Sequence, residues 1–571
     1  MKPLVEEKKL TYADKPWLKS YFVGASKLPK TMSPYPKISV CKFLDDAATD
    51  YPNNIVCVYL DKEMTYQELK LNVDKLATAL ADLGIKKGDR VATILPNSPQ
   101  FIICDFAIMR LGAIHVPLSI LHKAPELLYE LGESGAETVI CSYRRLDLIN
   151  KVKDKTKLKR IIYTSTRVFP DYSLPELKEI SDAYILEDLI EKYEPKPPKV
   201  EINPIEDLAQ LPFTGGTTGV PKGTMQTHYN ITTNVIQTLQ WMMHPLTVAV
   251  KGKASLVICV PIFHQYGHWA VFASIAWGIR IFLMDPRDID KMIEVIKKYR
   301  PFMIIGVPTH FILFLTKDIK RLPIFFFSAA AALPADVAQR FEKKIGVPMG
   351  EGYGATETTG GTHLNLSALS KVTGFISKVK RSIGIPVPDT EVKIVNPDTG
   401  KELPFGEAGE IWIRGPQVMK GYWPTPGNGL TEDGWLAMGD IGKMDEDGYF
   451  YIVDRIKDMI NVSGMKVYSR LVDDILYEHP GVSRVGVIGI PDPERPGSER
   501  VKAFISLKPE FEGKVTTDDI IEYCEEKLPA YAVPKFVEFR KELPLTLAMK
   551  LFKRKLREDE ITKMKVRGEI K

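Results

Sequence analysis

The chain has 571 residues, of which 44% are hydrophobic and 26% charged, and a net charge of +5 from 77 basic and 72 acidic residues. This length exceeds what one hydrophobic core usually supports, so we expect at least two domains. The composition excludes a disordered or fibrous chain. The small positive surplus argues against a nucleic-acid partner.

The N-terminal residues MKPLVEEKKL lack the apolar core of a signal peptide. The uncharged run over 322–334 is shorter than the roughly 18 residues that a membrane span needs. Six scattered cysteines form no Cys-x-x-Cys pair and lie mostly in apolar runs, which indicates buried thiols rather than a metal or disulfide framework. We therefore expect a soluble, cytoplasmic protein with no membrane span.

The first part of the chain alternates between strand and helix patterns. RVATILP (90–96) predicts a buried strand, and Ser98 and Pro99 then predict the start of a helix over the apolar spacing that follows. The same alternation recurs over 125–142 and 292–308. Repeated strand–helix units predict largely parallel sheets covered by helices, an α/β architecture.

The pattern changes after about residue 380 to short alternating runs broken by turn residues, such as EVKIVNPDTG and GEIWIRG. These runs predict an antiparallel β subdomain at about 380–456. From about 458, strand-like segments alternate with a helical pattern at TTDDIIEYCEEKL, which predicts a small α+β domain. We therefore expect an N-terminal domain over 1–456 and a C-terminal domain over 457–571.

The segment LPFTGGTTGVPKG (211–223) combines four glycines, three threonines and one lysine. Glycines let backbone N–H groups approach an anion, and threonine and lysine add donors, so the pattern predicts a phosphate-binding loop rather than an ordinary surface turn. A Walker A loop needs Gly-Lys-Ser/Thr, whereas Lys222 here precedes Gly223. The second glycine cluster, GEGYGATE (350–357), lacks the spacing of a dinucleotide-binding motif.

FTGGTTGVPKG resembles the signature loop of the acyl-adenylate-forming superfamily, which includes acyl-CoA synthetases, adenylation domains of nonribosomal peptide synthetases and firefly luciferase. Four later segments resemble further motifs of that family in its order: GYGATE (352–357), GWLAMGD (434–440), DRIKDMINVSG (454–464) and LPLTLAMKLFKRKLR (543–557). The resemblance covers nearly the whole chain. It implies a large domain, a hinge and a small mobile lid, and the activation of a carboxylic acid by ATP.

The resemblance also implies roles for individual residues. Glu357 would help hold Mg²⁺, Thr356 would contact the α-phosphate and Tyr353 would stack on adenine. Asp440 would accept the ribose hydroxyls, with support from Arg455. The nucleotide site would comprise Thr214, Gly215, Gly216, Thr217, Thr218, Gly219, Lys222, Gly352, Tyr353, Gly354, Asp440, Ile452 and Arg455.

Lys550 is the expected catalytic lysine and would stabilise charge between the carboxylate and the α-phosphate. The small residue and glycine that precede this lysine in the family are replaced by Ala548 and Met549, which leaves the loop conformation open. A plain basic helical face shared with the cations at 553–557 is the alternative. Lys457 would be the hinge, and the residues facing CoA after domain rotation would be Ser463, Gly464 and Lys466.

The acyl pocket is expected to include His264, Ala330, Ala331 and Gly354, although His264 could also be a core histidine. Acetyl-specific family members carry a tryptophan in place of Gly354, so the resemblance implies an acid longer than acetate. Medium or long fatty acids, aryl acids and hydroxy acids such as 4-hydroxybutyrate remain open. Gly215, where the family often has serine, is a variation that we associate with fatty acyl-CoA ligases.

The leading hypothesis is an AMP-forming acyl-CoA synthetase that uses ATP, Mg²⁺, CoA and a small-molecule carboxylic acid, with a homo-oligomer possible. Three alternatives share the nucleotide site. They are an adenylation enzyme that loads a carrier protein, a luciferase-like oxygenase and a non-catalytic nucleotide-binding relative.

Overall fold

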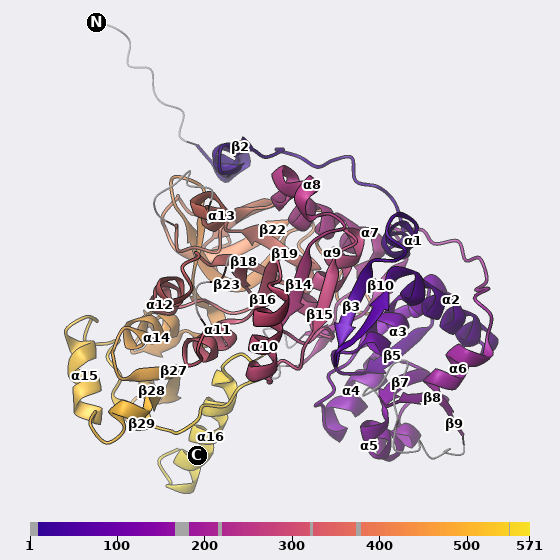
Figure 1. The fold of residues 1–571 in the computed structure, drawn as a ribbon. Helices are drawn as coiled ribbons and strands as arrows, with labels where there is room; N and C mark the ends of the chain where they lie inside the picture. The colour runs from indigo at the N-terminus through magenta and orange to yellow at the C-terminus, as the bar shows by residue number, and fades with distance from the viewer. Residues whose placement is uncertain are drawn as a thin grey trace, which may run out of the picture.

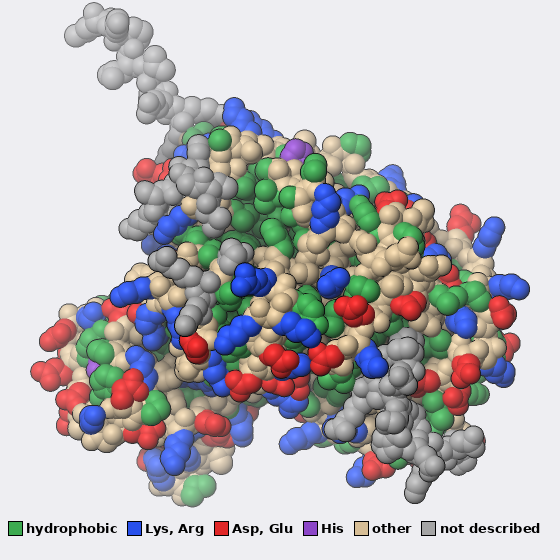
Figure 2. Space-filling view, viewed as in Figure 1, with side chains coloured by type: hydrophobic (Ala, Val, Ile, Leu, Met, Phe, Trp, Pro, Cys, Tyr) green, Lys and Arg blue, Asp and Glu red, His purple; other side chains and the backbone are tan. Residues whose placement is uncertain are grey.

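The computed structural model describes residues 10–165, 182–214, 220–319, 322, 324–372, 379–546 and 549–570. Figure 1 shows a large part, coloured indigo to orange, and a smaller C-terminal part in orange and yellow that lies to one side of it. On the face drawn in Figure 2, acidic and basic side chains are interspersed, in keeping with the small net charge. No helix in these ranges is long and apolar enough to cross a membrane.

Two mainly parallel sheets form the large part. The first has the order β13-β10-β6-β5-β7-β8-β9, and only its edge pair β10–β13 is antiparallel. Its strands are β5 (Arg90–Ile94), β6 (Ile114–Pro117), β7 (Thr138–Ser142), β8 (Arg160–Thr164), β9 (Ala183–Ile185), β10 (Leu208–Gln210) and β13 (Gln226–Thr227).

The second sheet has the order β20-β19-β18-β17-β16-β14-β15-β3-β4, with a parallel centre and antiparallel edges. Its strands are β3 (Ile55–Tyr59), β4 (Lys62–Thr65), β14 (Ser255–Ile258), β15 (Arg280–Leu283), β16 (Met303–Gly306), β17 (Phe325–Ser328), β18 (Gly350–Ala355), β19 (Gly360–Leu364) and β20 (Ile385–Pro386).

Helices separate and cover the two sheets, because strands buried on both faces need an apolar partner on each. In β14, Leu256 and Ile258 pack into the cluster between the sheets, whereas Val257 packs into the outer cluster. The layer between the sheets holds α1 (Cys41–Asp50), α2 (Tyr66–Asp82), α3 (Pro99–Arg110) and α9 (Gln265–Ala276). The outer layers hold α10 (Ile289–Tyr299), α11 (Pro308–Leu315) and α12 (Ala335–Ile345) on one side, and α4 (Ala124–Ser134) and α5 (Leu146–Val152) on the other.

Helix α3 illustrates how local sequence produces this arrangement. Ser98 precedes it with an extended backbone and Pro99 occupies the first turn, as predicted. Every residue of α3 except Arg110 is buried, since the helix lies inside the layer between the sheets. All six cysteines are likewise buried and unpaired, as predicted.

An antiparallel sheet and a small C-terminal unit complete the fold. The four-stranded sheet runs β21 (Glu391–Val395), β22 (Gly409–Arg414), β23 (Leu436–Met444) and β24 (Phe450–Arg455). Beyond the 3-10 turn Ile456–Asp458, the C-terminal unit contains β27 (Val482–Pro491), β28 (Glu499–Leu507), β29 (Phe536–Phe539), α14 (Ser469–Tyr477), α15 (Thr517–Glu525) and α16 (Lys553–Val566). The predicted fold class is confirmed, and the exact domain limits stay a prediction.

Candidate active site

The glycine-rich loop connects β11 (Phe213–Thr214) and β12 (Lys222–Gly223), in which Thr214 pairs with Lys222. Of the predicted loop residues, Gly215, Gly216, Thr217, Thr218 and Gly219 lie outside the described residues. The base of the hairpin is held by the segment 420–423, because the Trp423 N–H donates to Gly223 O (2.8 Å) and the Met225 N–H donates to Gly421 O (3.0 Å). This segment therefore fixes where Lys222 leaves the sheet.

The GYGATE motif lies on strand β18 and in the short turn that follows it. An added Cβ would lie 2.7 Å from the Phe327 ring at Gly352 and 1.9 Å from Gly360 O at Gly354, so both glycines permit close packing of the chain. A side chain at Gly354 would require β19 to move, which is a reason for glycine there besides the expected space for an acyl chain. Thr356 follows in a short turn, where its carbonyl accepts a hydrogen bond from Gln226 Nε2 (2.8 Å).

Asp440 joins the predicted adenine and ribose residues. It lies directly opposite Arg455 in the β23–β24 pair. Its Oδ1 lies 3.2 Å from Arg455 Nε, and its Oδ2 accepts a hydrogen bond from the Tyr353 hydroxyl at 2.6 Å. Burial, reinforced by this carboxylate, raises the pKa of Tyr353 well above its usual range, so the phenol stays a donor. An ionised carboxylate has about four acceptor sites, so two ribose hydroxyls can still be accommodated.

Glu357 and Lys222 both lie against Tyr422, a residue that no sequence motif indicated. The Tyr422 hydroxyl donates to Glu357 Oε1 at 2.8 Å, and Lys222 Nζ lies 4.9 Å from the centroid of the same ring. Among the described residues, the other carboxylate oxygen of Glu357 has no hydrogen-bond partner. A carboxylate with one fixed and one available oxygen suits a hard cation such as Mg²⁺.

Lys550 lies in a loop closed by backbone hydrogen bonds to Thr546. The Thr546 N–H donates to Lys550 O (2.7 Å), and the Met549 N–H donates to Thr546 O (3.0 Å). Leu547 and Ala548 lie outside the described residues. Burial lowers the pKa of Lys550 to about 7, with a further contribution from the positive charge of Arg455.

The alternative assignment of Lys550 to a basic helical face does not fit the structure. Helix α16 begins at Lys553, three residues beyond Lys550. Lys553 Nζ instead binds Asp473 Oδ2 (2.6 Å) and Ser469 Oγ (2.8 Å) of α14. This contact ties the end of the loop that carries Lys550 to the body of the C-terminal unit.

The residues expected at the acyl pocket come from the start of α9, from the loop after β17 and, for Gly354, from β18. His264 is the N-cap residue of α9, and burial, together with the charge on nearby Lys550, lowers its pKa to about 3. The imidazole is therefore neutral at physiological pH. Ala330 and Ala331 are half-buried after β17, and Ala330 adopts a left-handed φ of 66°.

The residues predicted for the hinge and for CoA binding follow β24, the strand that carries Ile452 of the predicted nucleotide site. Lys457 is in the turn after β24, and Ile452 within β24 accepts a hydrogen bond on its carbonyl from Arg470 Nη1 (2.7 Å). Ser463 and Gly464 form the turn of the hairpin between β25 (Ile460–Val462) and β26 (Met465–Val467). Lys466 on β26 is half-exposed and lies 3.2 Å from Asp398 Oδ2.

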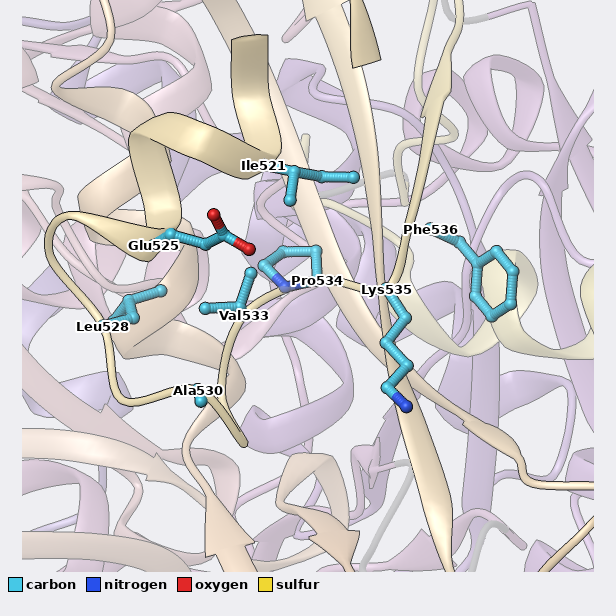
Figure 3. Close-up of a pocket in the computed structure, with 8 residues that line it drawn as sticks. All are labelled: Ile521, Glu525, Leu528, Ala530, Val533, Pro534, Lys535 and Phe536. Carbon is cyan, nitrogen blue, oxygen red and sulfur yellow. The ribbon is translucent and has the colours of Figure 1, made fainter. Parts of the chain in front are cut away.

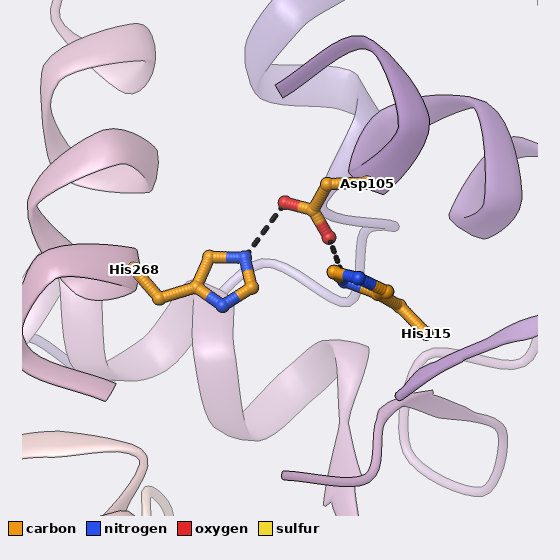
Figure 4. A group of neighbouring side chains, drawn as sticks. All are labelled: Asp105, His115 and His268. Carbon is orange, nitrogen blue, oxygen red and sulfur yellow. Dashed lines mark hydrogen bonds and ion pairs between the residues drawn. The ribbon is translucent and has the colours of Figure 1, made fainter. Parts of the chain in front are cut away.

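Two other features stand apart from these residues. Figure 4 shows Asp105 between His115 and His268, fully buried, with its two oxygens 2.7 Å and 2.8 Å from the two imidazoles. Each imidazole contacts a different oxygen of Asp105, so the three side chains form a hydrogen-bonded network rather than a coordination sphere. Figure 3 shows a pocket in the C-terminal unit that is lined by none of the predicted site residues. The volume of this pocket is about 560 Å³.

Comparison with known proteins identifies the class. Residues 44–423 match the family model of the AMP-binding enzyme, and residues 471–550 match the model of the AMP-binding enzyme C-terminal domain. The chain therefore belongs to the AMP-binding enzyme family, which confirms the predicted superfamily.

Individual relatives show which AMP-binding enzymes the chain is similar to. The chain is 35% identical to the long-chain-fatty-acid–CoA ligase of Bacillus subtilis, over 96% of this chain and 98% of the relative. It is 31% identical to a feruloyl-CoA synthase of an Amycolatopsis species, over 86% and 93%. The crystal structure of an anthranilate CoA ligase in complex with anthranoyl-AMP matches with a TM-score of 0.80 and 26% identity, over 93% and 98%. The predicted enzyme class, an acid–thiol ligase, is that of these relatives.

Proposed function

We propose that this protein is an AMP-forming acyl-CoA synthetase that joins a fatty acid to CoA through an acyl-adenylate. The observation that carries the proposal is the position of Lys550, which is close enough to Asp440 and Arg455 for their charges to act on its pKa. In its charged form, Lys550 would supply a cation from the C-terminal unit to the residues expected to bind the nucleotide. The carboxylate and the α-phosphate are both anionic, so such a cation lowers the barrier to their reaction.

The nucleotide would be held by groups that the fold brings together. Tyr353 would stack on adenine while its hydroxyl keeps Asp440 oriented toward the ribose. Lys222 and Thr214, at the two ends of the glycine loop, would bind the β- and γ-phosphates. Thr356 would contact the α-phosphate, with its turn fixed by the bond from Gln226.

Magnesium would be held by Glu357 and the phosphate oxygens, because one of the carboxylate oxygens remains available. When bound, the ion would neutralise charge on the departing pyrophosphate. Glu357 is held on both sides, since its backbone carbonyl also accepts a hydrogen bond from the Met419 N–H at 2.8 Å.

Thioester formation would follow a rotation about Lys457 that withdraws Lys550 and presents the hairpin carrying Ser463 and Gly464. Gly464 has a φ of 87° and no atom within 4 Å of an added Cβ, so the hairpin can approach a pantetheine chain closely. Lys466 would exchange its surface pairing with Asp398 for the 3′-phosphate of CoA. Surface ion pairs contribute little to stability, so breaking the pair between Lys466 and Asp398 would cost little free energy.

The acid is proposed to be a medium- or long-chain fatty acid. The support is the similarity to a long-chain-fatty-acid–CoA ligase over nearly the whole of both chains. The feruloyl and anthranilate relatives make an aryl acid the second candidate. A hydroxy acid such as 4-hydroxybutyrate has no comparable support.

One experiment tests the activity. The full chain is incubated with ATP, Mg²⁺ and acids of two to eighteen carbons, together with ferulate, anthranilate and 4-hydroxybutyrate, with and without CoA. We expect acid-dependent AMP and pyrophosphate release and thioester formation, most rapid with the longer fatty acids. Adenylate trapped by hydroxylamine without CoA turnover would instead indicate carrier loading, and no acid-dependent pyrophosphate release would indicate a non-catalytic relative.

A further inference from the structure

Tyr422 is fixed where the two phosphate-facing motifs meet. Its N–H donates to Asn428 O at 2.8 Å, and its backbone bridges to Thr224, one residue beyond β12. An added Cβ at Gly429 would lie 2.5 Å from the ring, so this glycine allows the chain to pack closely against the phenol. The ring is therefore confined by both backbone and packing.

The two ends of this side chain serve different motifs. The hydroxyl donates to Glu357 Oε1 at 2.8 Å, which belongs to GYGATE. The ring face lies 4.9 Å from Lys222 Nζ, which belongs to the glycine loop. Tyr422 itself lies in neither motif, so one rigid group sets the relative positions of an anion and a cation from separate parts of the chain.

We propose that Tyr422 is a positioning residue for the magnesium–triphosphate group, acting through Glu357 and Lys222; this inference rests on the proposed function. By holding Oε1, the hydroxyl orients the second oxygen of Glu357 toward the metal. By lying against Lys222 Nζ, the ring limits the positions that the ammonium can take and would favour its contact with the phosphates. Outer hydrogen bonds that orient a ligand typically change metal affinity by about 10- to 100-fold.

The hydroxyl and the ring can be separated by substitution. Tyr422→Phe removes only the hydrogen bond to Glu357, and Tyr422→Leu also removes the aromatic face under Lys222. The matched control is Tyr451→Phe, because the Tyr451 hydroxyl similarly donates to a carboxylate, Asp445, at 2.9 Å, in the antiparallel sheet.

Binding of ATP to the full-length variants is measured by calorimetry, in excess Mg²⁺ and in EDTA, without the acid. For Tyr422→Phe we expect a roughly tenfold loss of affinity in Mg²⁺ and less than a twofold change in EDTA. For Tyr422→Leu we expect an additional twofold to fivefold loss in EDTA, since a cation–aromatic contact contributes about 0.5–1 kcal/mol. Tyr451→Phe should match the parent in both conditions.

Glu357→Gln in the same assay separates the two proposals. If Glu357→Gln also leaves the Mg²⁺-dependent affinity unchanged, the proposed metal role of Glu357 fails. If Glu357→Gln loses that affinity while Tyr422→Phe does not, only the role of Tyr422 is overturned. Tighter Mg²⁺-dependent binding by Tyr422→Phe also overturns it, because the hydroxyl would then compete with the metal. Thermal unfolding of each variant verifies that the affinities refer to folded protein.

Discussion

Met549 immediately precedes the proposed catalytic lysine and carries two opposing effects on the loop. Its φ is 58°, in the left-handed region that a non-glycine residue rarely adopts. Its side chain is only 9% exposed and belongs to the same hydrophobic cluster as the core between the two sheets. The C-terminal loop therefore places one strained but buried side chain in the large part, directly beside Lys550.

The two effects can be weighed. A left-handed non-glycine residue costs about 1–2 kcal/mol, and burying a methionine side chain gains about 1.5–3 kcal/mol. The free energy gained by burying Met549 therefore exceeds the cost of its backbone strain by roughly 1 kcal/mol. Met549→Gly removes both effects, so we expect the loop-inserted conformation to lose about 1 kcal/mol, or about fivefold in population. Met549→Ala loses the burial and keeps the strain, and should be the more severe change.

The assay measures each half-reaction separately. Single-turnover pyrophosphate release reports adenylation, and thioester formation from supplied acyl-adenylate reports the second step. We expect adenylation to decrease in the order parent, Met549→Gly, Met549→Ala, with the second step unchanged or faster. Met549→Leu, which preserves bulk, is the matched control and should remain near the parent. Equal adenylation by Met549→Ala and the parent would refute the argument, because burial would then contribute nothing to loop insertion.

Three further outcomes are expected. Since the pKa of Lys550 is about 7 in the free protein, kcat/KM for ATP should fall as pH rises through 7. Lys550→Arg, if it retains activity, should abolish that fall. Identical pH profiles for the parent and Lys550→Arg would contradict the catalytic role of Lys550. Asp440→Asn weakens the acceptor shared by Tyr353 and Arg455, so ATP affinity should fall about 10- to 100-fold by calorimetry, and an unchanged affinity would argue against ribose binding. Asp105→Asn should lower the free energy of unfolding by about 3 kcal/mol in denaturant titration, because both imidazoles lose a charged acceptor. Metal chelation should leave the stability of the parent unchanged. A chelator-induced loss of stability would show that Asp105, His115 and His268 hold a metal.

The sequence predicts the fold well where patterns are local. Strand β5 and helix α3 follow from an apolar run, a serine cap and a first-turn proline, which are all readable within about twenty residues. The antiparallel sheet follows from turn residues between alternating runs. The pairing of β3 with β15 could not be predicted, because it joins segments more than 200 residues apart through apolar contacts that many registers would satisfy.

The site was predictable only where a motif carries the chemistry. Asp440 and Arg455 were selected from separate motifs, and the strand register places them directly opposite each other. Tyr422 escaped prediction because its role depends on a ring lying between Glu357 and Lys222, which no spacing in the sequence encodes. Gln226 escaped for the same reason, since its amide reaches a carbonyl 130 residues away. In the sequence, Asp105 is an isolated charge within an apolar helical pattern. The fold places His115 and His268 beside it.

The charges around Lys550 would connect nucleotide binding to the proposed rotation of the C-terminal unit. Burial, together with the positive charge of Arg455, lowers the pKa values of both Lys550 and Lys457. Asp440 is the anion that opposes this effect. A bound triphosphate would add several negative charges and favour the charged form of Lys550, so ATP should stabilise loop insertion. Once pyrophosphate leaves, much of that attraction is lost, and the burial of Met549 is then the main opposition to withdrawal. The departure of the first product would thereby release the loop for the second reaction.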